Sequence, residues 1–324
     1  MNAIAASTTI EAAYQAAQNG AVMIDRSQMG MLKFTGESRL DLINRMSTNG
    51  VLNLSSGEGR ATVLTTDIGR IVDRLILYAS SNAVYALTGA GNGDNVARYL
   101  MRFVFFNDDF HIEDLSAQTA IWGVYGAQAQ DMLASLLGPE TVDLPLHHWR
   151  ETSLHEVTVY VHRTDRVAGD GYFVMCQQQD SDGVLEALAS AGIQPIDEAA
   201  FEYLRIESSL PLFGLEMTQD YIPLETGLWG DVSFKKGCYI GQEIIARMES
   251  RGRLAKKLVQ LKLDVMAESM DAVTEGPGGR SVGTLTAVAD GPQGVLALGY
   301  IKTRALEKGE SLYVRGLPAT VVES

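Results

Sequence analysis

The chain has 324 residues, of which 46% are hydrophobic, and a formal net charge of −14. This length exceeds the usual size of one domain, so two or three domains are expected, and the acidic balance argues against general nucleic-acid binding. The sequence has no apolar run of about 18 residues and no basic segment ahead of an apolar one, so we expect a cytoplasmic protein without a membrane span.

Residues 1–115 predict a first α+β module with a mainly antiparallel sheet. Its first helix would be capped by Ser7 or Thr8 and would end at Gly20. The other expected elements, in chain order, are a strand at 30–36, a helix at 36–46, two strands in 59–80 around a turn at Asp67 to Gly69, a strand at 82–91, a helix at 94–104 and a strand at 110–116.

Residues 116–199 predict a second α+β module of similar order and size. Its expected elements are a strand at 120–126, a helix at 127–138, strands at 154–164 and 171–177, and a helix at 182–192. Residues from about 200 to 253 begin with a helix and a turn and would complete the first module. Short alternating strands separated by Gly and Pro in 254–324 predict a C-terminal β-barrel. The expected fold class is therefore α+β, with two ferredoxin-like modules followed by a barrel.

The two cysteines limit the metal chemistry of the chain. Cys176 and Cys238 lie far apart in the sequence, which favours free thiols over a disulfide framework. A self-contained iron-sulfur cluster or structural zinc usually needs about four ligands, and no CxxC or HxxxH spacing occurs, so no metal site is expected. His147 and His148 are expected in a solvent-facing loop after Pro145.

One segment, "KKGCYIGQEIIARMESRGR" at 235–253, concentrates cations around a thiol. Between Lys235 and Lys257 the chain has seven basic and two acidic residues. Such a run is either a solvated helix face or an anion site. Gly237 and Gly241 would give the loop backbone freedom, and the two lysines would favour the thiolate of Cys238, whereas the alternative is a small buried cysteine beside a turn.

The stretch "LRIESSLPLFGLEM" at 204–217 places Glu207 just before a turn. One interpretation is an exposed carboxylate on a strand. The other is a carboxylate that accepts hydrogen bonds from a ligand with two adjacent N–H donors, an edge that a pterin ring has.

These motifs resemble those of the YgfZ folate-binding proteins, relatives of the glycine-cleavage T-protein. The resemblance rests on "KGCYIGQE" with Ala246-Arg247 and Arg251-Gly252 behind it, and also on "LTTDIGRIVDRL", "RIESSLPLFG" and "GTLTAVADGPQGVLALGYI". It covers nearly the whole chain. It implies a T-protein-like fold in which two α+β modules and a barrel surround a tetrahydrofolate cavity.

The resemblance implies site residues. Cys238 and Lys236 would be the catalytic pair, and Glu207, Arg247, Arg251 and Asn95 would bind folate. Gly237, Gly241, Gln242 and Glu243 would shape the loop. T-proteins depend on an aspartate in the helix after a "VVNA"-like strand; in this chain Asn95 occupies that position, Asp94 precedes it, and an amide cannot act as an acid or base. T-proteins also lack the cysteine motif.

The function expected from this resemblance is tetrahydrofolate binding in support of the assembly or repair of iron-sulfur enzymes, with those enzymes or assembly proteins as partners. The alternative is a folate-dependent aminomethyltransferase-like one-carbon transferase, which releases ammonia. A third possibility is a folate-sensing scaffold without chemistry of its own. Basic residues beside Cys238 would hold the glutamate tail of the folate.

Overall fold

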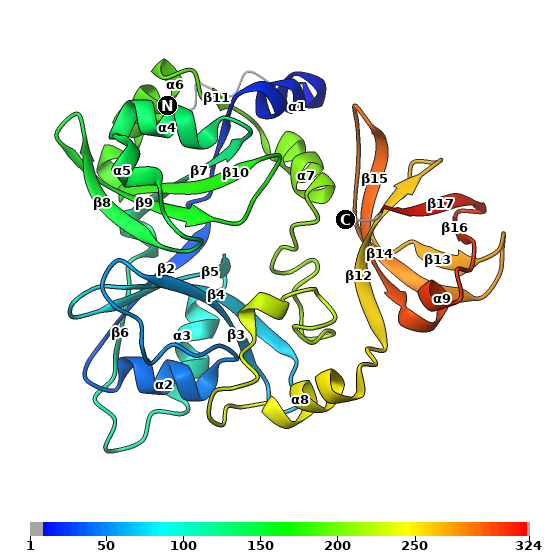
Figure 1. Ribbon diagram of the computed structural model, residues 1–324, viewed down its shortest axis with the longest axis horizontal. Coiled ribbons are helices and arrows are strands. Elements are labelled where there is room, and N and C mark those ends of the chain that lie inside the picture. Colours follow the sequence, from blue (N-terminus) through cyan, green and yellow to red (C-terminus); the bar gives the residue numbers. More distant parts are fainter. Residues whose placement is uncertain (1–8, 323–324) are drawn as a thin grey trace.

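The computed structural model describes residues 9–322, in which two helix-covered sheets are stacked and a β-barrel lies beside them (Figure 1). The first sheet is antiparallel, in the order β3-β4-β5-β2-β6. Its strands and the helices of this module are β2 (Met29–Thr35), α2 (Arg39–Met46), β3 (Gly59–Thr65), β4 (Ile71–Ala79), β5 (Val84–Ala90), α3 (Gly93–Met101) and β6 (His111–Asp114). Helix residues Leu42, Ile43 and Val96 pack with Leu32 and Leu75 of the sheet.

The second sheet has the order β11-β1-β7-β10-β9-β8 and a core of its own with α4 and α6. Its elements are β1 (Val22–Asp25), β7 (Thr119–Gly126), α4 (Ala129–Leu137), α5 (Pro139–Val142), β8 (Trp149–Leu154), β9 (Val157–Thr164), β10 (Asp170–Gln177), α6 (Ser181–Ser190) and β11 (Gln194–Pro195), with short 3₁₀ helices η1 (Ser116–Gln118) and η2 (Gln178–Asp180). Strand β1 pairs with β7 and β11, so a segment expected within the first module lies in the second sheet.

The two sheets face each other across a shared apolar layer. Met31, Ile76 and Leu87 of the first sheet belong to this layer, as do Phe173 and Met175 of the second. Both faces of the first sheet are therefore covered, by its own helices on one side and by the second sheet on the other. This explains the nearly continuous apolar run in β4.

The remaining elements connect the modules to the barrel. They are α1 (Ile10–Asn19), α7 (Glu198–Glu207), the 3₁₀ helix η3 (Trp229–Asp231), α8 (Gln242–Arg251) and α9 (Thr303–Glu307). The closed barrel runs β12-β15-β14-β13-β16-β17 and consists of β12 (Lys256–Leu263), β13 (Ala272–Glu275), β14 (Ser281–Gly291), β15 (Gly294–Lys302), β16 (Leu312–Val314) and β17 (Leu317–Val322). The α+β fold with a C-terminal barrel is confirmed.

Two local predictions differ from the structure. The first helix begins later than expected, because the hydroxyl of Thr9 accepts a hydrogen bond from the N–H of Ala12 at 3.2 Å and caps α1, whereas Ser7 and Thr8 lie outside the described residues. Glu207 is the last residue of α7 rather than part of a strand.

Candidate functional site

A central pocket of about 310 Å³ lies between the two sheets and the loop at 210–217 that follows α7. Its walls combine aromatic rings, carboxylates and two arginines. Its lining residues include Asp25, Arg26, Asp73, Arg74, Gly89, Tyr125, Asp165, Phe173, Glu198, Phe201, Phe213 and Met217. Both modules and the connecting loop therefore contribute to a single cavity.

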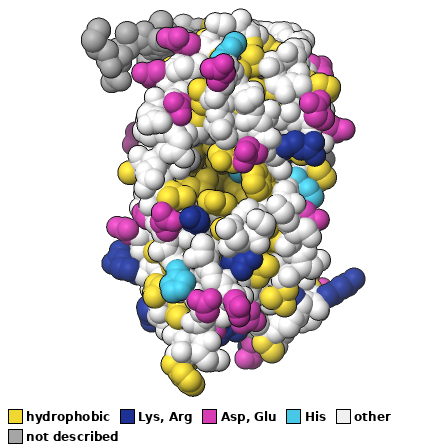
Figure 2. Space-filling view, turned by 90° about the vertical axis from the view of Figure 1, so that its left-hand side faces the viewer, with side chains coloured by type: hydrophobic (Ala, Val, Ile, Leu, Met, Phe, Trp, Pro, Cys, Tyr) yellow, Lys and Arg dark blue, Asp and Glu magenta, His cyan; other side chains and the backbone are white. Residues whose placement is uncertain are grey.

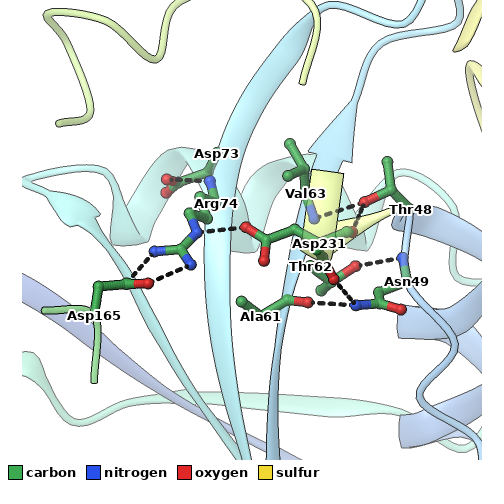
Figure 3. A network of polar contacts seen from close by, with 10 residues as sticks. Thr48, Asn49, Ala61, Thr62, Val63, Asp73, Arg74, Asp165 and Asp231 are labelled. Atoms are coloured by element: carbon green, nitrogen blue, oxygen red, sulfur yellow. Dashed lines mark hydrogen bonds and ion pairs between the residues drawn. The ribbon is translucent and has the colours of Figure 1, made fainter. Parts of the chain in front are cut away.

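Arg74, on β4, joins the modules at the wall of this pocket (Figure 3). Its guanidinium Nη1 and Nη2 donate to Oδ2 and Oδ1 of Asp165 at 2.6 and 3.2 Å, and its Nε donates to Oδ2 of Asp231 at 2.6 Å. Burial alone would lower the pKa of Arg74, but the two carboxylates raise it. Arg74 is thus held charged and in one orientation.

Asp73 precedes Arg74 and is completely buried. Its carboxylate accepts hydrogen bonds from the N–H of Gly89 at 2.9 Å, from the N–H of Arg74 at 2.8 Å and from Nδ2 of Asn92 at 2.9 Å. Burial raises the pKa of Asp73 to about 6, although these donors act in the opposite direction. The pocket wall therefore contains a carboxyl group that can hold or release a proton near neutral pH.

Asn95 is connected to this carboxyl group through a chain of side chains. Arg98 Nη2 donates to Oδ1 of Asn95 at 2.5 Å, and Nδ2 of Asn95 donates to Oδ1 of Asn92 at 3.0 Å. Asn92 in turn donates to Asp73. Asn95 itself lines an adjoining cavity that shares Phe213 and Met217 with the central pocket.

Phe213 lines both the central pocket and that adjoining cavity. Its ring lies against the backbone of Gly89, where a Cβ would come within 2.3 Å of Phe213 Cγ. A glycine is therefore needed at this position of β5 for the ring to pack as it does.

The cysteine loop lies away from the central pocket, at the start of α8 in the lower part of Figure 1. Cys238 and Gly237 are exposed. The ammonium group of Lys236 donates to the carbonyl oxygens of Asn44, Ser47 and Asn49 at 2.5, 2.6 and 2.9 Å. Burial lowers the pKa of Lys236 to about 8. Lys236 thus binds the C-terminal end of α2.

Gly241 fixes how this loop meets the first module. It has φ of +82°, and a Cβ there would lie 2.5 Å from the carbonyl oxygen of Thr66. Gln242 and Glu243 begin α8, and Arg247 pairs with Glu243 at 2.5 Å on an exposed face. Arg251 ends the helix, and its side chain lies outside the described part of the structure.

Glu207 also lies away from the central pocket. Its Oε1 accepts a hydrogen bond from Nε2 of Gln293 at 2.8 Å, and Nε2 of Gln293 also donates to the hydroxyl of Tyr14 at 2.6 Å. Partial burial raises the pKa of Glu207. Glu207 is thus placed at the contact between α7 and the barrel. None of the nine predicted site residues whose side chains the structure describes lines the central pocket.

The sequence prediction missed the polar residues that do line it. Asp73 and Arg74 are two consecutive charged residues inside an otherwise apolar strand, and this pattern could have identified them as candidate site residues. Asp165 and Phe213 carried no such signal. His147, expected in a solvent-facing loop, is buried, and burial lowers its pKa to about 4.

Membrane-spanning helices and metal-binding clusters are two features that the described residues can be searched for. No helix within 9–322 is long and apolar enough to cross a membrane. Among these same residues no group of three or more His, Cys, Asp and Glu side chains is arranged to hold a metal ion.

The fold matches that of aminomethyltransferases. A solved structure, aminomethyltransferase T of the glycine cleavage system from Bartonella henselae, superposes with a TM-score of 0.84 over 97% of this chain and 88% of its own, at 20% sequence identity. At that identity the likeness concerns the fold alone.

Sequence comparison places the chain in a family. Residues 3–236 match the GCVT N-terminal domain, and the chain belongs to this family. A chloroplastic Arabidopsis thaliana protein named as a transferase is 27% identical over 93% of this chain and 70% of its own length. An aminomethyltransferase of Halalkalibacterium halodurans is 29% identical over 79% of this chain and 71% of its own.

Proposed function

We propose that the chain binds tetrahydrofolate in the central pocket and acts as an aminomethyltransferase-like one-carbon transferase. The observation that carries the proposal is the buried carboxyl group of Asp73 at the pocket wall, with its pKa raised by burial to about 6. Membership of the GCVT family and the aminomethyltransferases among the relatives support the same reaction class. The sequence-based alternative thus becomes the first proposal.

The residues of the pocket fit a folate. The volume of about 310 Å³ lies at the lower end of the range of roughly 300–1,000 Å³ that is typical of small-molecule sites. The rings of Tyr125, Phe173, Phe201 and Phe213 offer apolar walls for a flat heterocycle. Carboxylates of Asp25 and other pocket residues are acceptors for its N–H edge.

Three residues of the pocket have distinct roles in this proposal. Bound tetrahydrofolate would supply the nitrogen atoms that accept the one-carbon unit. Asp73 would hold or release a proton on its carboxylate oxygens, because burial raises its pKa to about 6. Arg74, fixed by Asp165 and Asp231, would provide a constant positive charge. Phe213 would limit the access of water.

The experiment is an anaerobic calorimetric titration with tetrahydrofolate, combined with an assay of ammonia release from an aminomethyl donor. Phe213→Ala should weaken binding about tenfold, or 1.4 kcal/mol, because it removes one apolar wall. Asp73→Asn should bind folate yet release little ammonia. Glu207→Gln is the matched control, because it changes a carboxylate outside the pocket, and it should bind tetrahydrofolate like the wild type. Equal affinity in Phe213→Ala, or weakened binding in Glu207→Gln alone, would place the folate elsewhere.

A second candidate is a folate-binding protein of the YgfZ type that supports iron-sulfur enzymes. The observation that favours it is the exposed thiol of Cys238 within the "KGCYIGQE" loop. Under this proposal, Cys238→Ala would retain folate binding but lose the activity of iron-sulfur enzymes in cells. Cys176→Ser is the control for the other, buried thiol. Full activity of iron-sulfur enzymes in cells with Cys238→Ala would contradict this second candidate, and the transferase proposal would then be the remaining one.

A further inference from the structure

A second pocket, here called the side pocket, opens between the two modules on the face that points away from the barrel. Its volume is about 320 Å³. Figure 2 shows this face, where hydrophobic side chains line a hollow between the modules and charged residues lie around its rim. The side pocket and the central pocket have no lining residue in common.

Aromatic rings form one wall of the side pocket. The ring of Trp149 stacks on that of His162, with centroids 5.9 Å apart and an angle of 16° between the planes. Trp149 is also within 5.9 Å of Tyr160, and its Nε1 donates to the carbonyl oxygen of Ala79 at 2.9 Å. The wall is therefore held in place from both modules before any ligand arrives.

Two buried polar side chains of the pocket have no hydrogen-bond partner within the described residues. His162 is 4% exposed, and neither Nδ1 nor Nε2 is paired. Tyr78 is 1% exposed with an unpaired hydroxyl, and its ring lies edge-on to that of His162 at 4.0 Å. Buried polar groups are nearly always paired in folded proteins, so this pair of residues calls for an explanation.

The charge of the side pocket restricts what could pair with these groups. Of the described residues that line it, only Glu151 carries a charge, and it lies exposed. Burial lowers the pKa of His162 to about 3, so its imidazole is neutral at pH 7 and has one donor and one acceptor nitrogen. An anionic ligand would meet no cation in this pocket, whereas a neutral one would meet a donor and an acceptor.

We propose that the side pocket is a binding site for a neutral, planar heteroaromatic molecule that carries a hydrogen-bond donor beside an acceptor. The ligand would stack within the aromatic wall at Trp149, and its polar edge would pair with His162 and Tyr78. This site is separate from the central pocket and does not depend on the function proposed for that pocket.

The test uses adenine and benzimidazole as neutral probes and benzoate as an anionic aromatic control, each titrated into the full chain by calorimetry. The imidazole signals of His162 are followed in parallel by NMR and are assigned by their absence from His162→Phe. Saturable binding of at least one neutral probe, with a shift of the His162 signals, is the expected result. Benzoate should not bind.

Matched variants separate a ligand site from a packing role. Tyr78→Phe removes only the hydroxyl and should weaken probe binding about fivefold, and His162→Phe keeps an aromatic ring and should weaken it about tenfold. Asp73→Asn, in the other pocket, should leave probe affinity unchanged. The proposal is overturned if neither neutral probe saturates, or if both aromatic variants bind the probes as the wild type does while their thermal unfolding shows that they are folded.

Discussion

Arg205 and Glu216 form an ion pair in which both side chains are completely shielded from solvent, with Nη1 of Arg205 3.0 Å from Oε2 of Glu216. Arg205 lies on α7, and Glu216 lies in the loop that borders the central pocket. The same carboxylate accepts a hydrogen bond from the hydroxyl of Thr286 in the barrel at 2.7 Å. One buried pair therefore holds the connecting helix, the pocket loop and the barrel together.

Arg205→Leu should lower the free energy of unfolding by about 3–5 kcal/mol, because it leaves the Glu216 carboxylate buried without its partner. Arg315→Leu is the control and should lower it far less, since Arg315 pairs with Glu268 and Asp271 on an exposed surface, where water and salt screen such pairs. Chemical denaturation measures both. Similar losses in the two variants would contradict a special role for the buried pair.

Asp73→Asn should change how stability depends on pH. The native pKa of Asp73 is raised from 3.8 to about 6, so between these values the folded state holds a proton that the unfolded state has lost. Stability attributable to Asp73 therefore falls as the pH rises from about 4 to about 6, by an order of 3 kcal/mol in total. The difference between wild type and variant across this window is the measurement. Parallel unfolding curves would show that Asp73 does not titrate there.

Gly89→Ala should destabilise the chain by about 1–3 kcal/mol, because the added methyl group would overlap the ring of Phe213. Tetrahydrofolate affinity should fall as well if the folate occupies the central pocket. Gly183→Ala is the control, since a Cβ at this position of α6 meets no described atom within 4 Å. It should stabilise the helix by about 0.5–1 kcal/mol. Equal stability of the two variants would mean that Phe213 moves aside freely.

Lys236→Met should cost about 1–3 kcal/mol, because three carbonyl groups at the end of α2 lose their donor while the apolar stem is roughly retained. Lys235→Met, at an exposed neighbouring position, should stay within about 0.5 kcal/mol of the wild type. Thermal unfolding compares the two. A neutral effect of Lys236→Met would return Lys236 to the role predicted from the sequence, that of a charge beside Cys238.

The sequence predicted most of the fold, but the site residues it predicted lie away from the central pocket. Periodicity predicted the strands of the first sheet and the presence of a C-terminal barrel, because alternation and turns are local signals. Strand β1 was missed, since its four residues pair with strands about 100 and 170 positions later in the chain. The site residues were predicted mainly from the motif in the loop around Cys238. Asp73 and Asp165 line one pocket because distant elements pair in the fold, which no local pattern encodes.

The position of β1 has a consequence for the order in which the chain can fold. Val22–Asp25 must wait for the partner residues Trp122–Tyr125 of β7, about 100 residues later. At synthesis rates of roughly 5–20 residues per second this interval lasts about 5–20 s. During that time the first sheet can form from contiguous chain, while the apolar strand β1 ahead of it has neither of its neighbouring strands, β7 and β11, to pair with. The second sheet is thus a late, long-range assembly, and it is the part of the nascent chain most exposed to mispairing with other chains.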